Sequence, residues 1–505
     1  MDMQPSYHEI SDFPRMSWAC QIEANSGRAD ISHGPWVETN DVFFCEGAWA
    51  GAFEKGRFSD TYMLGTGGRF TEDGLLLSPP DHTMERLFIW RDTGRLVVTN
   101  SLALILALMG DDLDENCLLY NYWLVTAKDG LNDSVKSIPT RDGRTIEIHY
   151  YHNLLIRSDL STQIIEKQRK ADFNDYASYI AFLEGVMSGV AENARSSARK
   201  ITYEPISMLS SGYDSCAVTV LSKCMDNKEA ITFTKARGAS DVADSGHLVS
   251  EGIGLKTHKM DRLGYLEFND IPEFETQGSP SEMTSARELL SRRILLTGFP
   301  GDAVWDRLSP YHTNNMIRGD AGGTNIVELK NRFGFIHFPV PFLSTRCINE
   351  THAVTHSAEM APWTLNTRYD RPIPRRIVEE AGIKRGDFAE FKKAAGVYSV
   401  AEGLENTLSK ASFDSFQAYI RARWTPEKEA EAKRNNRLFK LHLWNKRISE
   451  RLAEFGPFRR LPKLPIVFDR AYPIGEHVML IHWATSQMVE RYTTWLSENR
   501  KDDAA

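Results

Sequence analysis

Two short stretches of the chain place small residues and an aspartate directly after an apolar run. Small residues let backbone amides approach an anion closely, and serine hydroxyls add donors, so such a stretch fits a phosphate or pyrophosphate. A carboxylate there repels the anion unless a cation lies between them, which indicates Mg²⁺. The first stretch is MLSSGYDSCAV, and its candidate ligand residues are Ser210, Ser211, Gly212, Asp214 and Ser215. On this stretch alone, a cluster of helix N-cap residues explains the same letters equally well.

The second stretch, LLTGFPGDAVWD, repeats the arrangement with Gly298, Gly301 and Asp302. An apolar run again leads into glycines and an aspartate at a predicted helix start. Two loops at one sheet edge, each with one carboxylate, suit a magnesium nucleotide held between them. We therefore expect Asp214 and Asp302 to bind one Mg²⁺ ion.

The elements that must position these loops are indicated by strand-like segments that alternate with helix-like ones. PISML, AITFT and RRILLTG are typical of strands, whereas DSCAVTVLSK and SGHLVSEGI are typical of helices. This alternation predicts a parallel sheet covered by helices. Ligands of open α/β sheets bind beyond the carboxyl ends of the strands, where a helix start offers unpaired N–H groups and the positive end of its dipole.

The chain before this region is rich in β-strand signals from Val42 to about Ile156. Asp92-Thr93-Gly94 and Asp142-Gly143 lie between strand-like runs and predict hairpins, and NSLALILALMG predicts a buried helix. These patterns indicate antiparallel sheet with packed helices, which ends at a polar junction, STQIIEKQRKADFND.

After the junction, apolar residues from Tyr176 to Val190 recur at helical spacing, and from about Ala411 the chain reads mostly helical. The expected fold class is therefore α/β. It comprises an α+β domain at residues 1–165 and a parallel-sheet domain with a helical C-terminal part at residues 166–505.

Composition narrows the function classes. The chain has 505 residues, 42% of them hydrophobic, and a net charge of −8, which gives no bulk attraction to nucleic acid or anionic lipid. The six cysteines form no CxxC pair, which argues against a zinc ribbon or a disulfide framework. The start resembles no signal peptide, and the longest apolar run, Leu102 to Met109, is too short to cross a bilayer. We expect a cytoplasmic protein with neither nucleic acid nor membrane as a partner.

Three stretches of the chain carry a family resemblance. SSGYDS resembles the SGGxDS pyrophosphatase loop of asparagine synthetase-like enzymes, TGFPGDAV resembles a later loop of the same enzymes, and YDRPIPRRIVEEAGIKRGDFAEFKKAAG is similar to their segment that delivers a catalytic lysine. Order and spacing agree over roughly Ser207 to Gly396. The first region resembles, more weakly, the glutaminase-like sandwich domain of these enzymes.

The resemblance implies an adenine-nucleotide α-hydrolase-like synthetase domain that binds ATP and Mg²⁺. It assigns the phosphates to Ser210, Ser211, Gly212, Asp214 and Ser215 with Gly298 and Gly301, and the metal to Asp214 and Asp302. Lys392, or its neighbour Lys393, would stabilise charge on the reacting adenylate; two solvated lysines on a helix are the alternative. The basic run from Arg371 to Arg376 either supports phosphates or forms surface salt bridges.

The chain also departs from the family. No cysteine precedes Cys20, whereas the glutaminases use an exposed terminal cysteine as nucleophile, so the first domain is expected to be a scaffold, as in β-lactam synthetase-like enzymes. Phe299 stands where relatives carry a glutamate or tyrosine, Ala303 replaces a glutamate, and Ser211 replaces a loop glycine. Glu282 is a candidate replacement base, although a glutamate at a helix start explains it as well.

The implied activity is adenylation of a carboxylate, followed by attack of an amine to give an amide and AMP. The partners are then a small-molecule or peptide carboxylate and an amine, and a homodimer remains open. A non-catalytic nucleotide- or partner-binding homologue is the main alternative, because of the departures from the family pattern. A sulfur-transferring or argininosuccinate-forming relative is a further one, although thiolating enzymes usually need a cysteine pair or a nucleic-acid patch.

Overall fold

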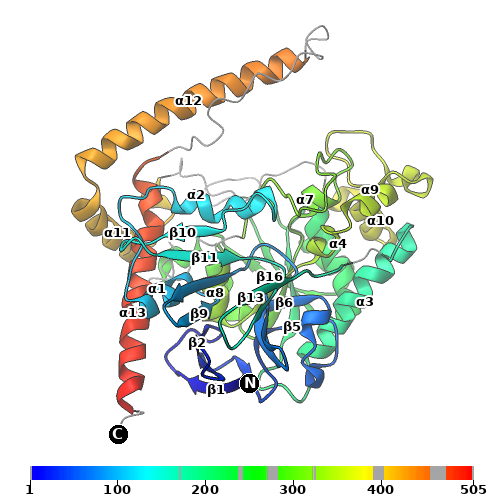
Figure 1. Cartoon of the computed structure of the whole chain (residues 1–505). Helices are drawn as coiled ribbons and strands as arrows, with labels where there is room; N and C mark the ends of the chain where they lie inside the picture. Colours follow the sequence, from blue (N-terminus) through cyan, green and yellow to red (C-terminus); the bar gives the residue numbers. More distant parts are fainter. Residues whose placement is uncertain are drawn as a thin grey trace.

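The structure is a computed structural model that describes residues 3–169, 172–236, 243–268, 270, 282–320, 322–323, 326–389, 403–454 and 474–502 (Figure 1). Within these residues the protein is a mixed α/β structure with three sheets, one of them parallel, and a helical C-terminal region.

Two sheets form from the first part of the chain. One has the order β1-β3-β2-β9-β8-β11-β10 and the other the order β13-β12-β7-β6-β5-β4, and both are antiparallel apart from the β1–β3 pair. Trp18 and Ile31 from one sheet share a core with Phe44 and Leu77 from the other, so the sheets pack face to face. The strands are β1 (Gln4–Glu9), β2 (Trp18–Glu23), β3 (Arg28–His33), β4 (Glu38–Thr39), β5 (Phe43–Trp49), β6 (Met63–Thr71), β7 (Gly74–Ser78), β8 (Leu87–Asp92), β9 (Arg95–Thr99), β10 (Ser137–Pro139), β11 (Thr145–His149), β12 (Asn153–Ile156) and β13 (Thr162–Ile165).

The predicted local features of this part are confirmed, with one correction. Thr93-Gly94 forms the turn that connects β8 with β9, and Asp142-Gly143 lies between β10 and β11. Helix α1 (Leu102–Met109) begins after Ser101, whose hydroxyl accepts from the amide of Leu104, and is followed by the short α2 (Tyr120–Leu124). The predicted start of the β-rich region at Val42 is wrong, because strands already begin at Gln4. Strand β1 is only partly buried and gives no apolar alternation in the sequence.

A five-stranded parallel sheet follows, in the order β16-β15-β14-β17-β18. Its strands are β14 (Glu204–Leu209), β15 (Glu229–Phe233), β16 (Lys256–Met260), β17 (Arg293–Thr297) and β18 (Ile336–Pro339). Its helices are α3 (Tyr176–Ala194), α4 (Tyr213–Leu221), α5 (His247–Gly252), α6 (Arg287–Leu290), α7 (Gly301–Val304), α8 (Ile326–Phe333), α9 (Ile348–Thr355) and α10 (Pro372–Glu380). The predicted parallel sheet is therefore confirmed, and so is the amphipathic helix that begins at Tyr176. The edge strands β16 and β18 were not predicted.

The C-terminal region consists of α11 (Lys410–Arg423), α12 (Pro426–Glu454) and α13 (Leu480–Asp502). Helix α12 extends away from the rest of the molecule, whereas α13 runs back beside α1 (Figure 1). Trp483 and Tyr492 of α13 share a core with Phe13, Ala19 and Leu104 of the first part of the chain. The predicted junction near residue 165 thus lies between β13 and α3. We call the part of the chain before this junction the first unit and the part with the parallel sheet the parallel-sheet unit. Helix α13, at the end of the chain, packs against the first unit.

All six cysteines are free, and four of them are buried.

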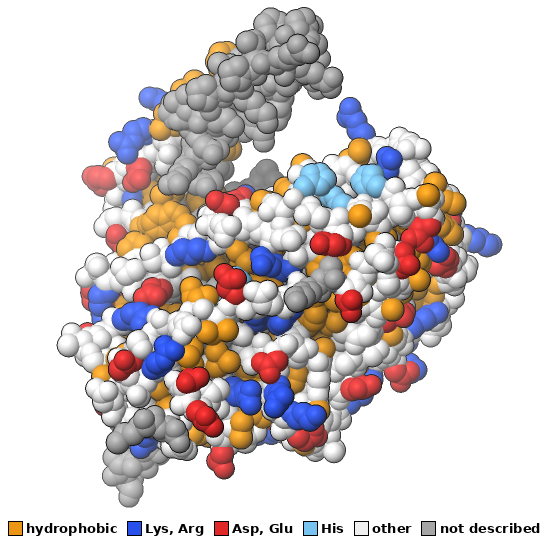
Figure 2. Space-filling model, turned by 45° about the vertical axis from the view of Figure 1, so that its right-hand side comes forward, with side chains coloured by type: hydrophobic (Ala, Val, Ile, Leu, Met, Phe, Trp, Pro, Cys, Tyr) orange, Lys and Arg blue, Asp and Glu red, His pale blue; other side chains and the backbone are white. Residues whose placement is uncertain are grey.

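The surface carries both signs of charge. Acidic and basic side chains are interspersed over the face drawn in Figure 2. Among the helices of the described residues, none combines the length and the apolar character that crossing a bilayer requires.

Candidate functional site

The strand order places a topological switch point between β14 and β17. Strand β14 is the first of the parallel sheet; β15 and β16 extend the sheet on one side of it, and β17 and β18 extend it on the other. The chain therefore leaves the carboxyl ends of two adjacent strands in opposite directions, and such a switch point is where open α/β sheets bind ligands. Residues Ser207 and Leu296 are paired across β14 and β17, so the two predicted loops begin side by side.

The loop after β14 is stiffened by its own hydroxyl groups. The Ser210 hydroxyl lies 2.8 Å from that of Ser215 and accepts the amide of Gly212 at 3.2 Å. The Ser215 hydroxyl also accepts the amide of Ser210 at 3.1 Å. Gly212 is the N-cap of α4, and a glycine has no side chain with which to satisfy the first amides of the helix. The helix start therefore suits an anion, and Ser210 and Ser215 fix its shape.

Ser211 does not strain this loop. Its φ lies outside the left-handed region, and that of Gly212 is −79°, so neither position requires a glycine backbone. The Ser211 hydroxyl donates to the Asp244 carboxylate at 3.0 Å, and its amide donates to the Asp244 carbonyl at 3.1 Å. The serine that departs from the family pattern is thus held by a third loop, which follows β15.

The loop after β17 packs directly against Asp214. A Cβ added to Gly298 would lie 2.5 Å from the backbone of Asp214 and Ser215, and one added to Gly301 would lie 2.4 Å from the Asp214 carboxyl carbon. Both glycines are therefore needed for close approach of the two loops. Asp302 follows Gly301 in the first turn of α7. The structure thus brings Asp214 and the Asp302 loop together, as predicted.

Asp214 is the electrostatic centre of the site. Its side chain is 19% exposed, and its Oδ2 accepts a hydrogen bond from the Arg371 guanidinium, whereas its Oδ1 is buried without a hydrogen-bond partner. Burial raises the pKa of Asp214 to about 6; Arg371 opposes this shift, and the charges of Asp302 and Asp306 add to it. The carboxylates of Asp214, Asp302 and Asp306 and the guanidinium of Arg371 therefore lie together at this switch point of the sheet.

Arg371 comes from the start of α10, which packs against α4. Its side chain is 3% exposed, with Nε 3.7 Å from the Asp306 carboxylate. Burial lowers the pKa of Arg371, but Asp214, Tyr369 and Asp302 together outweigh burial and the net shift is upward. The rest of the basic run behaves differently, because Arg375 and Arg376 pair with Glu379 and Glu380 on their own helix. The salt-bridge alternative is confirmed for Arg375 and Arg376, whereas a role of Arg371 with phosphates stays a prediction.

Glu282 is joined to the site by a chain of charged groups. Its carboxylate lies 3.1 Å from Arg262, and Arg262 lies 3.7 Å from the buried Asp244 that holds Ser211. Glu282 is the first residue of a short 3₁₀ helix, as the capping alternative expected. Asp244 and Asp306 were not predicted, and their signal in the sequence is only that each carboxylate follows a strand end or short helix.

Two further predicted residues, Lys392 and Lys393, lie outside the described residues. The last described residue before them is Ala389, whose amide donates to the Ser211 carbonyl at 2.6 Å. Arg385 from the same segment donates to the hydroxyl of Tyr213 at 3.0 Å. The segment that precedes the two lysines is therefore anchored on the loop after β14.

The residues present fit a divalent cation that is also bound by phosphates. No group of three or more histidine, cysteine or acidic side chains is arranged to hold a metal within the described ranges. Mg²⁺, however, is usually bound through one or two carboxylates together with substrate phosphates. The unpartnered buried Oδ1 of Asp214, beside the Asp302 loop, is suited to such a role.

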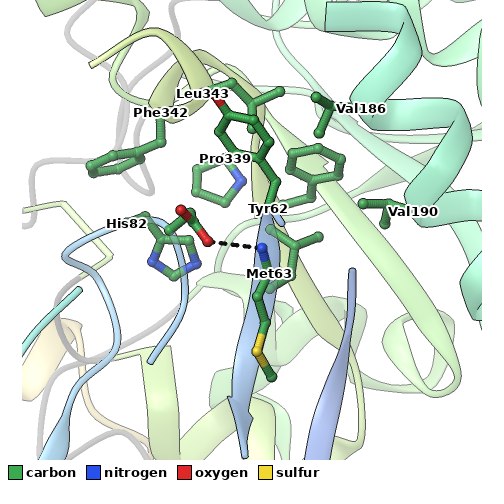
Figure 3. Close-up of a pocket in the computed structure, with 11 residues that line it drawn as sticks. Tyr62, Met63, His82, Val186, Val190, Pro339, Phe342 and Leu343 are labelled. Carbon is green, nitrogen blue, oxygen red and sulfur yellow. Dashed lines mark hydrogen bonds between the residues drawn. The ribbon is translucent and has the colours of Figure 1, made fainter. Parts of the chain in front are cut away.

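A small cavity between the first unit and the parallel-sheet unit does not compete with this site. It has a volume of about 10 Å³ and is lined by Tyr62, His82, Val186, Phe342 and other mostly apolar residues (Figure 3). The Asp81 carboxylate beside it accepts the amide of Met63 at 2.8 Å. This volume corresponds to about one water molecule, so the cavity holds no substrate.

Comparison with known proteins gives no assignment, because the chain matches no protein-family model and no curated protein sequence.

Proposed function

We propose that the protein is an ATP-dependent amide ligase of the asparagine synthetase-like type. A substrate carboxylate oxygen would bond to the α-phosphorus of ATP as the bond to pyrophosphate breaks. An amine nitrogen would then bond to the acyl carbon, AMP would leave with the electron pair, and the amine would lose a proton. The observation that carries this proposal is the buried, unpartnered Oδ1 of Asp214, pressed against the Asp302 loop at the switch point of the sheet.

The residues at the switch point would bind the phosphates and supply charge that balances them. The loop from Ser210 to Ser215 and the start of α4 would bind phosphate oxygens through amides and hydroxyls. Asp214 and Asp302 would hold Mg²⁺, which supplies positive charge against the phosphates when bound. Arg371 adds a fixed positive charge at the same place. Preorganised charges of this kind stabilise negative charge on a leaving group without further reorganisation.

Phe299 has no basic atom, so it does not accept the proton that the amine loses. Glu282 is engaged by Arg262, so its carboxylate serves as a positioning group for the Asp244 loop in this proposal. Water or the substrate itself would then accept the proton.

The source of the amine is proposed to be the substrate and not glutamine. Cys20 lies fully buried within β2, and burial raises the pKa of its thiol. Neither property suits a nucleophile for glutamine hydrolysis. Cys216, beside the phosphate loop, is also buried with a raised pKa, which disfavours a thiolating reaction.

Pyrophosphate exchange tests the proposal. Wild type, Asp302→Asn and Asp214→Asn would be assayed for carboxylate-dependent exchange of labelled pyrophosphate into ATP, with a panel of mono- and dicarboxylates. We expect exchange in wild type and a loss of about 10²–10³-fold in each variant. Asp226→Asn is the matched control, because Asp226 is 70% exposed and pairs with Lys228 at the surface. Equal exchange in Asp302→Asn and wild type would remove that aspartate from the site.

A non-catalytic nucleotide-binding homologue is the second candidate. The ion pair of Asp214 with Arg371 favours it, because that pair already engages one of the two carboxylate oxygens. Calorimetric titration of wild type with MgATP separates the two candidates. Binding together with pyrophosphate exchange supports the ligase, whereas binding without exchange across the whole carboxylate panel supports the homologue.

A further inference from the structure

The first amides of helix α4 have no acceptor within the helix itself. The first hydrogen bond of the helix runs from the amide of Cys216 to the carbonyl of Gly212, so the amides of Tyr213, Asp214 and Ser215 precede it. These are the amides that the proposed function assigns to phosphate oxygens. An oxygen from another part of the chain that reaches one of them competes with a phosphate.

Tyr369 supplies such an oxygen. Its hydroxyl lies 3.9 Å from the position of a Cβ added to Gly212, the N-cap of α4. Burial raises the pKa of Tyr369 to about 12, with Arg371 opposing this shift and Asp214 adding to it. A hydrogen bond from the backbone of Tyr213 also lowers the pKa, and only a donor, the amide N–H, has that effect. The Tyr369 oxygen therefore lies where it accepts the first amide of the helix.

The ring of Tyr369 is held in this position from two sides. Its centroid lies 4.9 Å from that of the Tyr213 ring, at an interplanar angle of 53°, and the Cζ of Arg371 lies 5.2 Å from it. Tyr369 is also partly exposed. Because part of the side chain already faces solvent, the ring has a path outward.

The backbone beside Tyr369 is anchored. Asp370 is 1% exposed; its carboxylate accepts the amide of Leu365 at 3.1 Å, and its carbonyl accepts that of Arg307 at 3.0 Å. The next residue, Arg371, is held by its ion pair at the switch point. A movement of the tyrosine is therefore a rotation of its side chain and not an opening of the segment.

We infer that the Tyr369 hydroxyl occupies the place of a phosphate oxygen at the start of α4 and that the nucleotide displaces it. An amide has one hydrogen, so the tyrosine oxygen and a phosphate oxygen exclude each other. The apparent affinity for nucleotide is then reduced by the fraction of molecules in which the ring has turned outward. This inference rests on the proposed function for the identity of the ligand. It makes Tyr369 an internal competitor that sets the nucleotide concentration at which the site fills.

Calorimetric titration with MgATP tests the displacement through the sign of the effect. Tyr369→Phe keeps the ring and removes the oxygen, so nothing has to leave the amide. We expect this variant to bind MgATP about three- to tenfold more tightly than wild type, which corresponds to one hydrogen bond. Weaker binding would make the hydroxyl a phosphate ligand, and equal binding would remove it from the phosphate position. Either result would overturn the inference.

Thermal unfolding without nucleotide separates this effect from a structural one. Loss of the hydroxyl is expected to lower Tm, because it removes a hydrogen bond of the folded protein. A lower Tm with unchanged MgATP affinity would make the hydroxyl purely structural and contradict the inference.

Tyr7→Phe is the matched control, because the Tyr7 hydroxyl donates to the Asn40 carbonyl at 2.7 Å in the first unit. It is expected to bind MgATP within twofold of wild type. Tightening as large as that of Tyr369→Phe would show that the effect does not come from the start of α4.

Fluorine NMR follows the side chain directly. A 3-fluorotyrosine incorporated at position 369 gives one resonance in the full-length protein. Saturating MgATP is expected to shift this resonance toward its value in the urea-unfolded protein. A resonance that saturating MgATP leaves unchanged means that the ring stays at the helix, and the displacement would be wrong.

The pyrophosphate exchange assay keeps this inference separate from the proposed function. Absence of exchange in wild type, together with tighter MgATP binding by Tyr369→Phe, would reject the ligase and support the internal competitor. Exchange in wild type, together with unchanged MgATP affinity in Tyr369→Phe, would support the ligase and reject the competitor.

Discussion

Two ion clusters of this protein each pair a basic side chain with carboxylates and differ in their access to solvent. In one, Lys330 of α8 lies between Glu46 and Glu85 of the first unit, with 2.7 Å and 2.5 Å between the ammonium and the two carboxylates. In the other, Arg371 pairs with Asp214 at the edge of the parallel sheet. Both clusters join segments that are distant in the sequence. Their exposure and their place in the fold set them apart.

The Lys330 cluster is sealed from solvent. The second oxygen of Glu46 accepts the amide and hydroxyl of Thr66 and the side chain of Asn100. The second oxygen of Glu85 lies 3.6 Å from His82 and has no hydrogen-bond partner. All three charged side chains are at most 1% exposed, so the cluster joins distant segments of the chain and leaves no access for a ligand.

The Asp214 cluster is open by comparison. Each cluster leaves one carboxylate oxygen without a hydrogen-bond partner, Oε1 of Glu85 and Oδ1 of Asp214. The Asp214 side chain, however, is 19% exposed, and the glycines of the opposite loop bring a second acidic residue close to it. The contrast teaches that burial of charge alone does not indicate a site. An unpartnered acceptor at a strand end, next to a helix start, does.

The largest effect that tests this contrast is loss of Lys330. Lys330→Met leaves two buried carboxylates without their shared cation, so we expect about 3–5 kcal/mol of lost unfolding free energy. Urea unfolding measures it. Lys200→Met is the matched control, because its ammonium pairs with Glu9 at the surface and its side chain is 43% exposed; a loss below about 1 kcal/mol is expected there. Similar losses in both variants would mean that the Lys330 cluster is not structural.

A smaller effect concerns the extra proton of this cluster. Burial raises the pKa of Glu85 to about 7; Lys330 opposes the shift and Glu46 adds to it. The folded state therefore holds the proton more tightly than the unfolded chain, and this contribution to stability is lost as pH rises from about 4.5 to about 7.

Glu85→Gln isolates that contribution, because glutamine is uncharged at every pH. We expect the variant to gain stability relative to wild type as pH rises from 5 to 8, by on the order of 1–3 kcal/mol. Buried histidines with lowered pKa values, such as His337, affect both proteins equally and cancel in the difference. A difference between the two proteins that stays constant with pH contradicts the raised pKa.

The parts of the fold that the sequence predicts are those encoded by neighbouring residues. Asp142-Gly143 and the Ser101 and Gly110 ends of α1 are local signals, and the structure confirms the turn and the helix. Strands β1, β16 and β18 lacked such signals. The return of α13 to the first unit depends on contacts between Trp483 and residues far earlier in the chain, which no local pattern reports.

The candidate site shows the same division. Asp214 and Asp302 were predicted to meet, because each follows a strand of one parallel sheet and such strand ends share an edge. Arg371 was predicted only as one member of a basic run, since a sequence does not distinguish a buried ion pair from a surface one. Asp244 was missed altogether, because its hydrogen bonds with Ser211 exist only in three dimensions.

The smallest effect tests the unfinished cluster through its titration. A metal ligand must be ionised, and the pKa of Asp214 is raised to about 6, so protonation of Asp214 competes with Mg²⁺ binding below that pH. Calorimetric affinity for MgATP is therefore expected to rise up to about tenfold per pH unit below 6 and to level off above it. Asp214→Asn, measured in parallel, accounts for titration of the nucleotide itself, and the ratio of the two affinities carries the effect of Asp214.

Arg371→Met sharpens the comparison, because loss of the guanidinium removes the charge that opposes the effect of burial on the pKa of Asp214. The midpoint of the pH dependence should then move above 6. An unchanged midpoint in that variant would show that Arg371 does not control the charge of Asp214, and the resemblance between the two ion clusters would end there.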